Sequence, residues 1–302
     1  MTSTNQILAP RVAFDERLSR DNIFAEVFGG LTSDQWRDTL IRSIVEPKID
    51  GVEFPSFPSE ELQNRIHGHS AAHSLREAAS FYDFIRAQNL TGPGAPWHGK
   101  GRLLDFGAGW GRILRLFLRD FPLRNIVGFE PNGIFCSVAR ANNPFVSFVG
   151  GEFMPPTMLS GGQINLIVGW SVFSHLSEMS ATAWLAEFSR LLAPGGAAVL
   201  TTRGIRFLER LRSEAEQLRA GQEIHWYSRV CLDAVGNIED RITEYSNGKF
   251  VWFALDASKL YGEAFLGQDA LTALIAERNL PLELELFDST SLAQDVFVLR
   301  RL

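Results

Sequence analysis

Cysteine and positive charge are both scarce in this sequence, and each shortage excludes a class of protein. The 302 residues include only two cysteines, Cys136 and Cys231, which can form neither a disulfide framework nor a cysteine metal cluster. The 29 Lys and Arg residues are outnumbered by 35 Asp and Glu residues, which gives a net charge of −6. Because proteins that bind nucleic acids usually carry a basic surface, no nucleic-acid partner is expected.

Long hydrophobic runs and histidine–acid clusters are missing as well. The longest apolar run, INLIVGWSVF at 164–173, is far too short to span a bilayer. Residues 1–21 have neither the basic nor the apolar region of a signal peptide. We therefore expect a cytoplasmic protein without a membrane span. No acid lies between His69 and His73, so no metal site is expected there either.

The spacing of apolar residues changes along the chain. Helical spacing over 14–46 and 73–88 predicts helices in the first third of the sequence. The stretch TGPGAPWHGKG at 91–101 is rich in turn-forming residues and predicts a boundary. We expect an N-terminal helical cap over 1–98 and a second domain over 99–302, with an insertion at about 205–250.

In the second domain, short buried strands alternate with helices. This alternation predicts right-handed βαβ units and an α/β fold of the Rossmann-like, doubly wound type. A sixth strand is expected within 246–256, and the segments 282–288 and 294–301 are expected to form a final antiparallel pair. The first five strands are predicted at 102–106, 125–130, 145–151, 164–170 and 197–202, and helices at 110–121, 131–143, 180–196, 207–221 and 267–279.

A glycine-rich loop follows the first of these strands. Gly107, Gly109 and Gly111 lie at the carboxyl end of the strand, where open α/β sheets bind ligands. Glycines there allow the backbone to approach a ligand closely. A nicotinamide dinucleotide requires the spacing G-x-G-x-x-G, but position 112 is Arg, and Asp105 before the loop would repel a pyrophosphate.

Three acids follow or end three successive strands, and they suit S-adenosylmethionine, which has no phosphate and carries cationic groups. Asp105 can face the ammonium group. Glu130 can accept both ribose hydroxyls, because a carboxylate has two acceptor oxygens. Glu152 can accept from the adenine amino group, with the Phe153 N–H directed at the ring.

Five segments together resemble class I S-adenosylmethionine-dependent methyltransferases: LLDFGAGWGR, VGFEPN, GGEFMPP, LIVGWSVFSHLSE and LLAPGGAAVLTTRG, within about 100–205. The resemblance implies a seven-stranded sheet with its last strand antiparallel. RIHG at 65–68, SVFSHL at 171–176 and WLAEF at 184–188 are similar to a bacterial subgroup often found with glycan and polysaccharide assembly enzymes or acting on small metabolites.

The resemblance also implies the cofactor-binding residues. Glu130, with Pro131 beside it, holds the ribose, and Glu152 and Phe153 frame the adenine. Arg65 pairs with the methionine carboxylate from the cap. The family often has Cys or Thr where Ala108 stands, and small residues are interchangeable there. The methionine moiety and sulfonium are then lined by Gly107, Ala108, Gly109, Gly111, Trp170 and Ser171.

The candidates for a general base are His175, just after the fourth strand, His225 in the insertion, and Asp256 after the expected sixth strand. Each has an ordinary structural role as its alternative. The sequence predicts an S-adenosyl-L-methionine-dependent methyltransferase acting on a hydroxyl, less readily an amine, of a sugar, glycan or small metabolite. Two alternatives stay open: a non-catalytic S-adenosylmethionine-binding partner or scaffold protein, and an NAD-dependent oxidoreductase.

Overall fold

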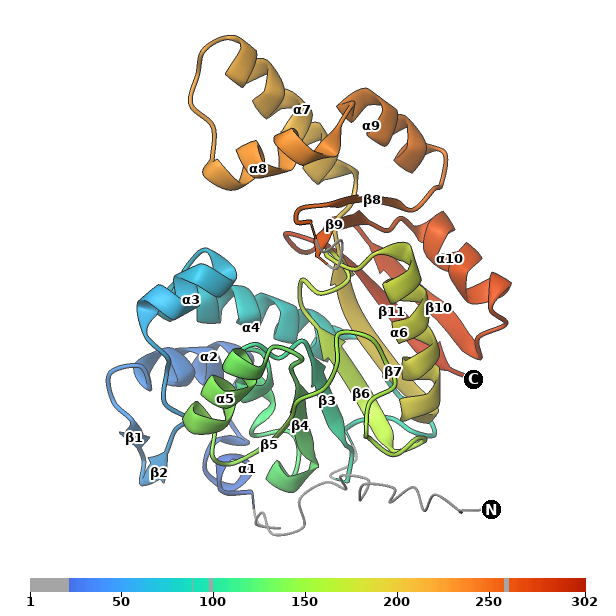
Figure 1. The fold of residues 1–302 in the computed structure, drawn as a ribbon. Helices are drawn as coiled ribbons and strands as arrows, with labels where there is room; N and C mark the ends of the chain where they lie inside the picture. Colours follow the sequence, from blue (N-terminus) through green and yellow to red (C-terminus); the bar gives the residue numbers. More distant parts are fainter. Residues whose placement is uncertain (1–21, 89, 98–99, 258–260) are drawn as a thin grey trace, which may run out of the picture.

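The computed structural model describes residues 22–88, 90–97, 100–257 and 261–302, and it is built around one seven-stranded sheet (Figure 1). The strand order is β5-β4-β3-β6-β7-β11-β10. Strand β11 runs antiparallel to both neighbours, while β5, β4, β3, β6 and β7 are parallel. This confirms the predicted Rossmann-like fold with its last strand antiparallel. The strands are β3 Leu103–Phe106, β4 Ile126–Phe129, β5 Ser147–Val149, β6 Ile164–Gly169, β7 Leu192–Thr202, β10 Leu282–Asp288 and β11 Asp295–Arg301.

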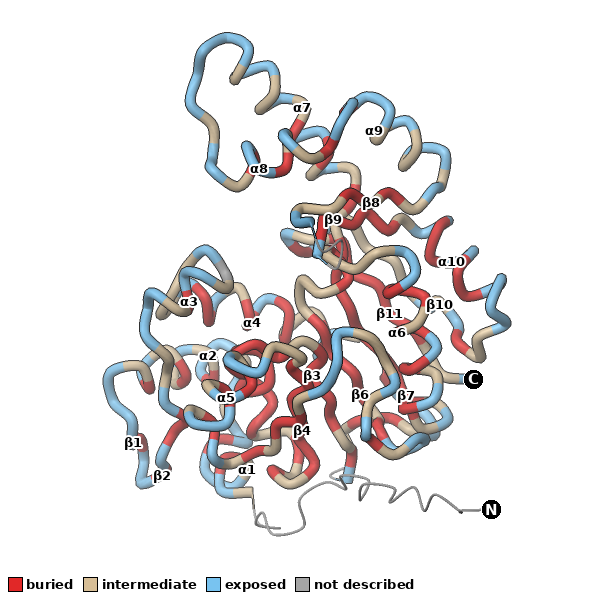
Figure 2. The backbone as a smooth tube through the Cα atoms, viewed as in Figure 1, coloured by how far each residue is buried: buried red, intermediate tan, exposed pale blue. Residues whose placement is uncertain are grey.

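Helices cover both faces of the sheet because neighbouring residues of a strand point to opposite sides. Leu103 packs in one cluster with α4 (Ala71–Ala87) and α5 (Gly133–Asn142), whereas Leu104 packs in another with α6 (Glu178–Leu191) and α10 (Gln268–Glu277). Figure 2 shows the buried strands between these layers. No helix in the described ranges is long and apolar enough to cross a membrane.

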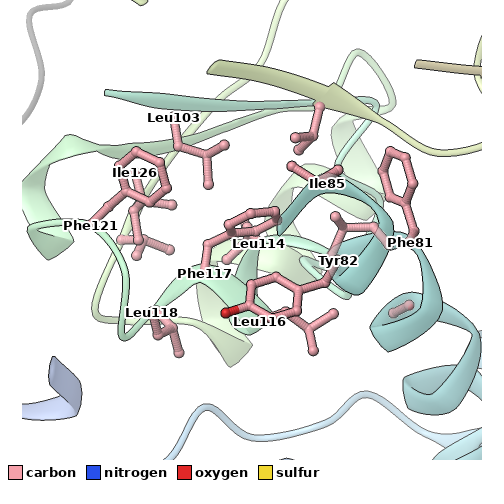
Figure 3. Packing of buried hydrophobic residues seen from close by; sticks show 14 of the residues in the cluster. Phe81, Tyr82, Ile85, Leu103, Leu114, Leu116, Phe117, Leu118, Phe121 and Ile126 are labelled. Carbon is pink, nitrogen blue, oxygen red and sulfur yellow. The ribbon is translucent and has the colours of Figure 1, made fainter. Parts of the chain in front are cut away.

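The N-terminal segment shares the core of the sheet. On α4, Phe81, Tyr82 and Ile85 pack with Leu114 and Phe117 in one apolar cluster (Figure 3). The predicted boundary at 98/99 lies outside the described residues and stays a prediction, and residues on both sides of it belong to the same cluster. The other elements of this segment are α1 Ile23–Phe28, α2 Ser33–Arg42, β1 Lys48–Ile49, β2 Val52–Glu53 and α3 Glu60–His67.

The helix predicted over 110–121 is wrong, because only a 3₁₀ turn, η1 (Leu114–Phe117), forms there. Side chains take the backbone partners that an α-helix would use. The Leu114 N–H donates to the Asp105 carboxylate, and the Trp110 carbonyl accepts from the Asn143 amide. A second 3₁₀ turn, η2 (Leu123–Asn125), leads into β4.

The strand predicted within 246–256 forms, but it is not part of the main sheet. Strand β8 (Val251–Ala254) pairs with β9 (Gly262–Phe265) in a separate two-stranded hairpin that the sequence did not predict. Before it come three helices, α7 (Ile205–Arg219), α8 (Trp226–Val235) and α9 (Ile238–Ser246). Helices and hairpin share an apolar cluster of their own and form the lobe at the top of Figure 1. We call residues 205–257 and 261–265 the insertion lobe.

A substitution of Trp36 can show whether the N-terminal segment folds together with the sheet. The Trp36 ring is fully buried, and its Nε1–H donates to the Leu116 carbonyl at 2.8 Å. Trp36→Ala should therefore lower the free energy of unfolding of the whole molecule by about 3–5 kcal/mol, measured by urea denaturation. Val45→Ala, at a residue that is 85% exposed, is the control and should change it by less than about 0.5 kcal/mol. Two separate transitions, with only one shifted, would show an independent N-terminal domain.

Candidate functional site

Gly107, Gly109 and Gly111 have positive φ angles of 73°, 55° and 88°. The space around each of them is limited by different neighbours. A Cβ on Gly107 would collide with the Val172 side chain, and one on Gly111 would lie 2.8 Å from the Asn143 amide nitrogen. A Cβ on Gly109 would meet nothing nearer than a methyl group of Ile66 at 3.9 Å. The fold thus requires glycine at two positions, while Gly109 faces open space.

Glu130 supports the loop from the end of β4. Its carboxylate is buried, and its two oxygens accept from the backbone N–H groups of Gly109 and Asn132, both at 2.8 Å. Burial raises the pKa of Glu130, and the two N–H groups oppose that rise. Each carboxylate oxygen keeps a second lone pair, so Glu130 can accept further hydrogen bonds. Pro131 follows it, half-buried.

Asp105 lies behind the glycine loop and is only 1% exposed. One oxygen accepts from the Leu114 N–H at 3.1 Å. Burial raises the pKa of this carboxyl to about 7, Leu114 and Arg112 lower it, and Glu130 raises it further. Its contact with Leu114 holds the turn after the loop in place.

The residues after β5 and β6 differ in exposure. Glu152 and Phe153 are both exposed, and the Phe153 carbonyl accepts from Trp184 Nε1 at 3.0 Å. Trp170, at the end of β6, packs its ring against Phe81 of α4 with centroids 5.1 Å apart. The α4 helix therefore reaches the carboxyl ends of the strands.

Ser171 has a left-handed backbone, with φ of 59°, which is uncommon for a residue other than glycine. Its N–H donates to Thr201 Oγ1 at 2.7 Å, and its hydroxyl accepts from Gln294 Nε2 at 2.8 Å. Thr201 in turn donates to Gln294 Oε1 at 2.9 Å. Thr201 and Gln294 were not predicted, because no spacing in the sequence links them to Ser171. Together they hold the strained turn that follows β6.

Arg65 lies on α3 and is exposed. Within the residues that the structure describes, its side chain makes no hydrogen bond or ion pair. Its neighbour Ile66 is the residue closest to the open side of Gly109. The end of α3 therefore lies next to the glycine loop.

The three candidates for a general base lie in different settings. His175 contacts β9: its Nδ1 is 2.9 Å from the Gly262 carbonyl oxygen and 3.3 Å from a Glu263 carboxylate oxygen. His225 is exposed and caps α8, with its Nδ1 accepting from the Tyr227 N–H at 3.2 Å. Asp256 is exposed in the turn after β8. The two acceptor oxygens beside Nδ1 of His175 would orient this ring as a catalytic side chain.

A family model described as "Methyltransferase domain" matches residues 71–236, which is more than half of the chain. The chain belongs to this family. It is an S-adenosylmethionine-dependent methyltransferase, and S-adenosyl-L-methionine is its cofactor. The alternative of an NAD-dependent oxidoreductase is set aside.

Solved structures resemble the fold at low sequence identity. The PH0226 protein from Pyrococcus horikoshii OT3 is 15% identical with a TM-score of 0.50, over 81% of this chain and 99% of that one. CalS10 from Micromonospora echinaspora, an amino pentose methyltransferase, is 19% identical with a TM-score of 0.49, over 82% of this chain and 98% of that one. A search of curated proteins gave no match.

Two glycine substitutions should separate the needs of the ligand from those of the fold. Gly109→Ala adds a methyl group in open space and should cost about 1–2 kcal/mol of backbone strain, but it should weaken S-adenosylhomocysteine binding at least tenfold. Gly111→Ala should destabilise the protein more, because Asn143 must also move. Calorimetry and urea denaturation measure the two effects. Unchanged binding by Gly109→Ala would contradict the assignment.

The raised pKa of Asp105 makes stability depend on pH. The unfolded chain releases this proton near pH 4, but the folded protein keeps it to about pH 7. Folding therefore takes up a proton in this range, and stability falls as the pH rises through it. Asp105→Asn removes the titration but keeps an acceptor for Leu114. The slopes of unfolding free energy against pH should differ by up to about 1.4 kcal/mol per unit. Parallel curves would refute the assignment.

Proposed function

We propose that the protein transfers the methyl group to a hydroxyl of a sugar, glycan or small metabolite, with an amine as the less favoured acceptor. The observation that carries the proposal is the pair of acceptor oxygens beside His175 Nδ1. Because both oxygens are acceptors, that nitrogen must carry the proton. The neutral ring then has its free lone pair on Nε2. A hydroxyl has to lose its proton as it is methylated, whereas a neutral amine attacks with its own lone pair, so a base at this position favours a hydroxyl.

The position of His175 supports this role. It follows β6 in the same loop as Trp170 and Ser171, which we propose lie beside the sulfonium. Strand β6 is the direct neighbour of β3, whose carboxyl end carries the glycine loop. The His175 side chain is 18% exposed, so that a substrate can reach it.

We further propose a cofactor site along the ends of β5, β4, β3 and β6. The free lone pairs of Glu130 suit the two ribose hydroxyls, and the open side of Gly109 leaves room for the methionine moiety. Arg65 would pair with the cofactor carboxylate, since α3 reaches the loop. The full set is Arg65, Asp105, Gly107, Ala108, Gly109, Gly111, Glu130, Pro131, Glu152, Phe153, Trp170 and Ser171.

The chemistry needs little from the protein beyond positioning and a proton acceptor. The bound cofactor would supply a methyl group attached to a sulfonium sulfur. When the methyl group is transferred, the sulfur keeps the electron pair of the carbon–sulfur bond. His175 Nε2 takes the proton from the acceptor hydroxyl and later releases it to water. The preference for a glycan or small metabolite rests on the subgroup resemblance of residues 65–68, 171–176 and 184–188.

The product of the reaction tests the acceptor type. The protein should transfer an isotope-labelled methyl group from S-adenosylmethionine to a component of a bacterial small-molecule extract, and NMR should identify an O-methyl carbon. His175→Asn should lower kcat by about 10²–10⁴-fold, the range for general-base catalysis, with cofactor affinity retained. An N-methyl product, or a larger loss in His225→Asn, would overturn the assignment. A protein that binds the cofactor but never forms S-adenosylhomocysteine would be the scaffold alternative.

A further inference from the structure

A fully buried carboxylate lies where the insertion lobe meets the ends of β6 and β7. Glu263, in β9, is 0% exposed. Three side chains from three other parts of the chain contact it. Arg203, just after β7, forms an ion pair with it, and the Tyr227 hydroxyl of α8 donates to it. His175, after β6, places Nδ1 3.3 Å from the same carboxylate oxygen that Tyr227 contacts.

The backbone holds this cluster in register. The Ala264 N–H of β9 donates to the Ser174 carbonyl at 2.8 Å, and Arg203 forms a parallel bridge with Phe265. The Trp252 Nε1–H of β8 points to the His175 carbonyl at 3.4 Å. The hairpin is therefore attached to the segments that follow β6 and β7, and Glu263 is directed at His175 by a fixed frame.

Burying a carboxylate costs several kcal/mol unless a counter-charge and hydrogen bonds offset the loss of water. Arg203 supplies the counter-charge and is itself held over the Phe207 ring at 3.8 Å. Burial, with Glu263 nearby, raises the pKa of Tyr227 far above its ordinary value, so this hydroxyl keeps its proton and remains a donor. Arg203 Nε faces one carboxylate oxygen as an ion pair without hydrogen-bond geometry, while the other oxygen accepts from Tyr227 and faces His175 Nδ1.

We propose that Glu263 is a positioning residue for methyl transfer, which keeps the proton of His175 on Nδ1 and directs the unprotonated Nε2 at the acceptor hydroxyl. The inference rests on the proposed function. When the acceptor O–H bond breaks, its proton binds Nε2 and the ring becomes an imidazolium, which the neighbouring carboxylate stabilises. Release of that proton to water restores the neutral ring.

Tyr261 indicates where the acceptor oxygen would lie. Its ring stacks on His175 with centroids 4.5 Å apart, and its hydroxyl is 3.4 Å from Nε2. This contact is too long for a firm hydrogen bond, and Tyr261 is 45% exposed as a residue. An acceptor hydroxyl can therefore replace the phenol at Nε2. On this view the insertion lobe supplies the acceptor side of the site.

Four other titratable side chains interact with the Glu263 carboxylate, and they come from the segment after β7, from α8 and from the residue before β9. Arg203 carries the positive charge, Tyr227 and Tyr261 both have raised pKa values, and burial raises the pKa of the Cys231 thiol of α8 to about 12. None of these side chains changes its charge between about pH 5 and pH 9. The pH dependence of turnover therefore tests the proposed base, His175.

Glu263→Gln and Tyr227→Phe, which both conserve the size of the side chain, should shift the acid limb of the kcat–pH profile in opposite directions. Glu263→Gln removes the negative charge, so the imidazolium loses its proton more easily and the acid limb of the kcat–pH profile should move to lower pH. Tyr227→Phe removes a donor from the carboxylate, which leaves more negative charge for His175, and the acid limb should move to higher pH. Glu263→Gln should also lower kcat at least tenfold, with S-adenosylhomocysteine affinity within twofold of the unmodified protein.

Nitrogen-15 NMR of the histidine rings gives a readout that does not depend on turnover. In the unmodified protein the His175 signal, identified by its loss in His175→Asn, should be that of the Nδ1–H tautomer, and Glu263→Gln should shift it toward a mixture. The role of Glu263 would be refuted if Glu263→Gln kept the Nδ1–H tautomer and if neither Glu263→Gln nor Tyr227→Phe moved the acid limb of the profile. If His175→Asn turns over normally, the proposed base itself is wrong, whatever the NMR of Glu263→Gln shows. Tyr227→Phe keeps the ion pair and decides the matter if Glu263→Gln does not fold.

Discussion

The buried guanidinium of Arg115 is the constraint on which the ligand-binding edge of the sheet depends. It donates to the Ser56 carbonyl, the Asn143 side chain and the Gly111 carbonyl at 3.0, 2.9 and 3.3 Å. These acceptors belong to the N-terminal segment, the end of α5 and the glycine loop. Burial lowers the pKa of Arg115 to about 9, and no carboxylate pairs with it within the described ranges. Neutral acceptors and the rings of Phe57 and Trp110 offset the cost of removing this charge from water.

The two sides of the proposed site are built differently. The cofactor side comes from loops after parallel strands, so its residues converge because the strands end at one edge. Glu130 shows this arrangement, since one carboxylate braces the glycine loop and the turn into α5. The acceptor side depends on a hairpin far along the chain, which reaches His175 through Gly262 and Glu263. A relative could therefore change its acceptor through the insertion lobe and keep the cofactor side intact.

The sequence predicted the parallel strands because their short apolar runs alternate with segments of helical spacing, and glycine or acid follows directly after β3, β4 and β5. It could not predict the 3₁₀ turn at 114–117, where Asp105 and Asn143 take backbone partners from a segment with good helical spacing. It also missed β9, because GEAF at 262–265 contains Gly, Glu and Ala, which are depleted in strands. No sequence motif includes Glu263. Its function depends on contacts from three distant segments, and no local pattern records such contacts.

The three loop glycines are required for different reasons, and this difference can indicate whether a related sequence has lost its cofactor. Gly107 and Gly111 are fixed by Val172 and Asn143, which belong to the protein itself, whereas Gly109 has only open space in front of it. A descendant that had lost its cofactor would still need the first and last glycine in order to fold. At position 109 only the positive φ angle would still be selected, and Asn or Asp, which tolerate this angle, could replace the glycine. If Gly109 lines the cofactor as proposed, a sequence that keeps Gly107 and Gly111 but carries a side chain at 109 would be the mark of a pseudoenzyme.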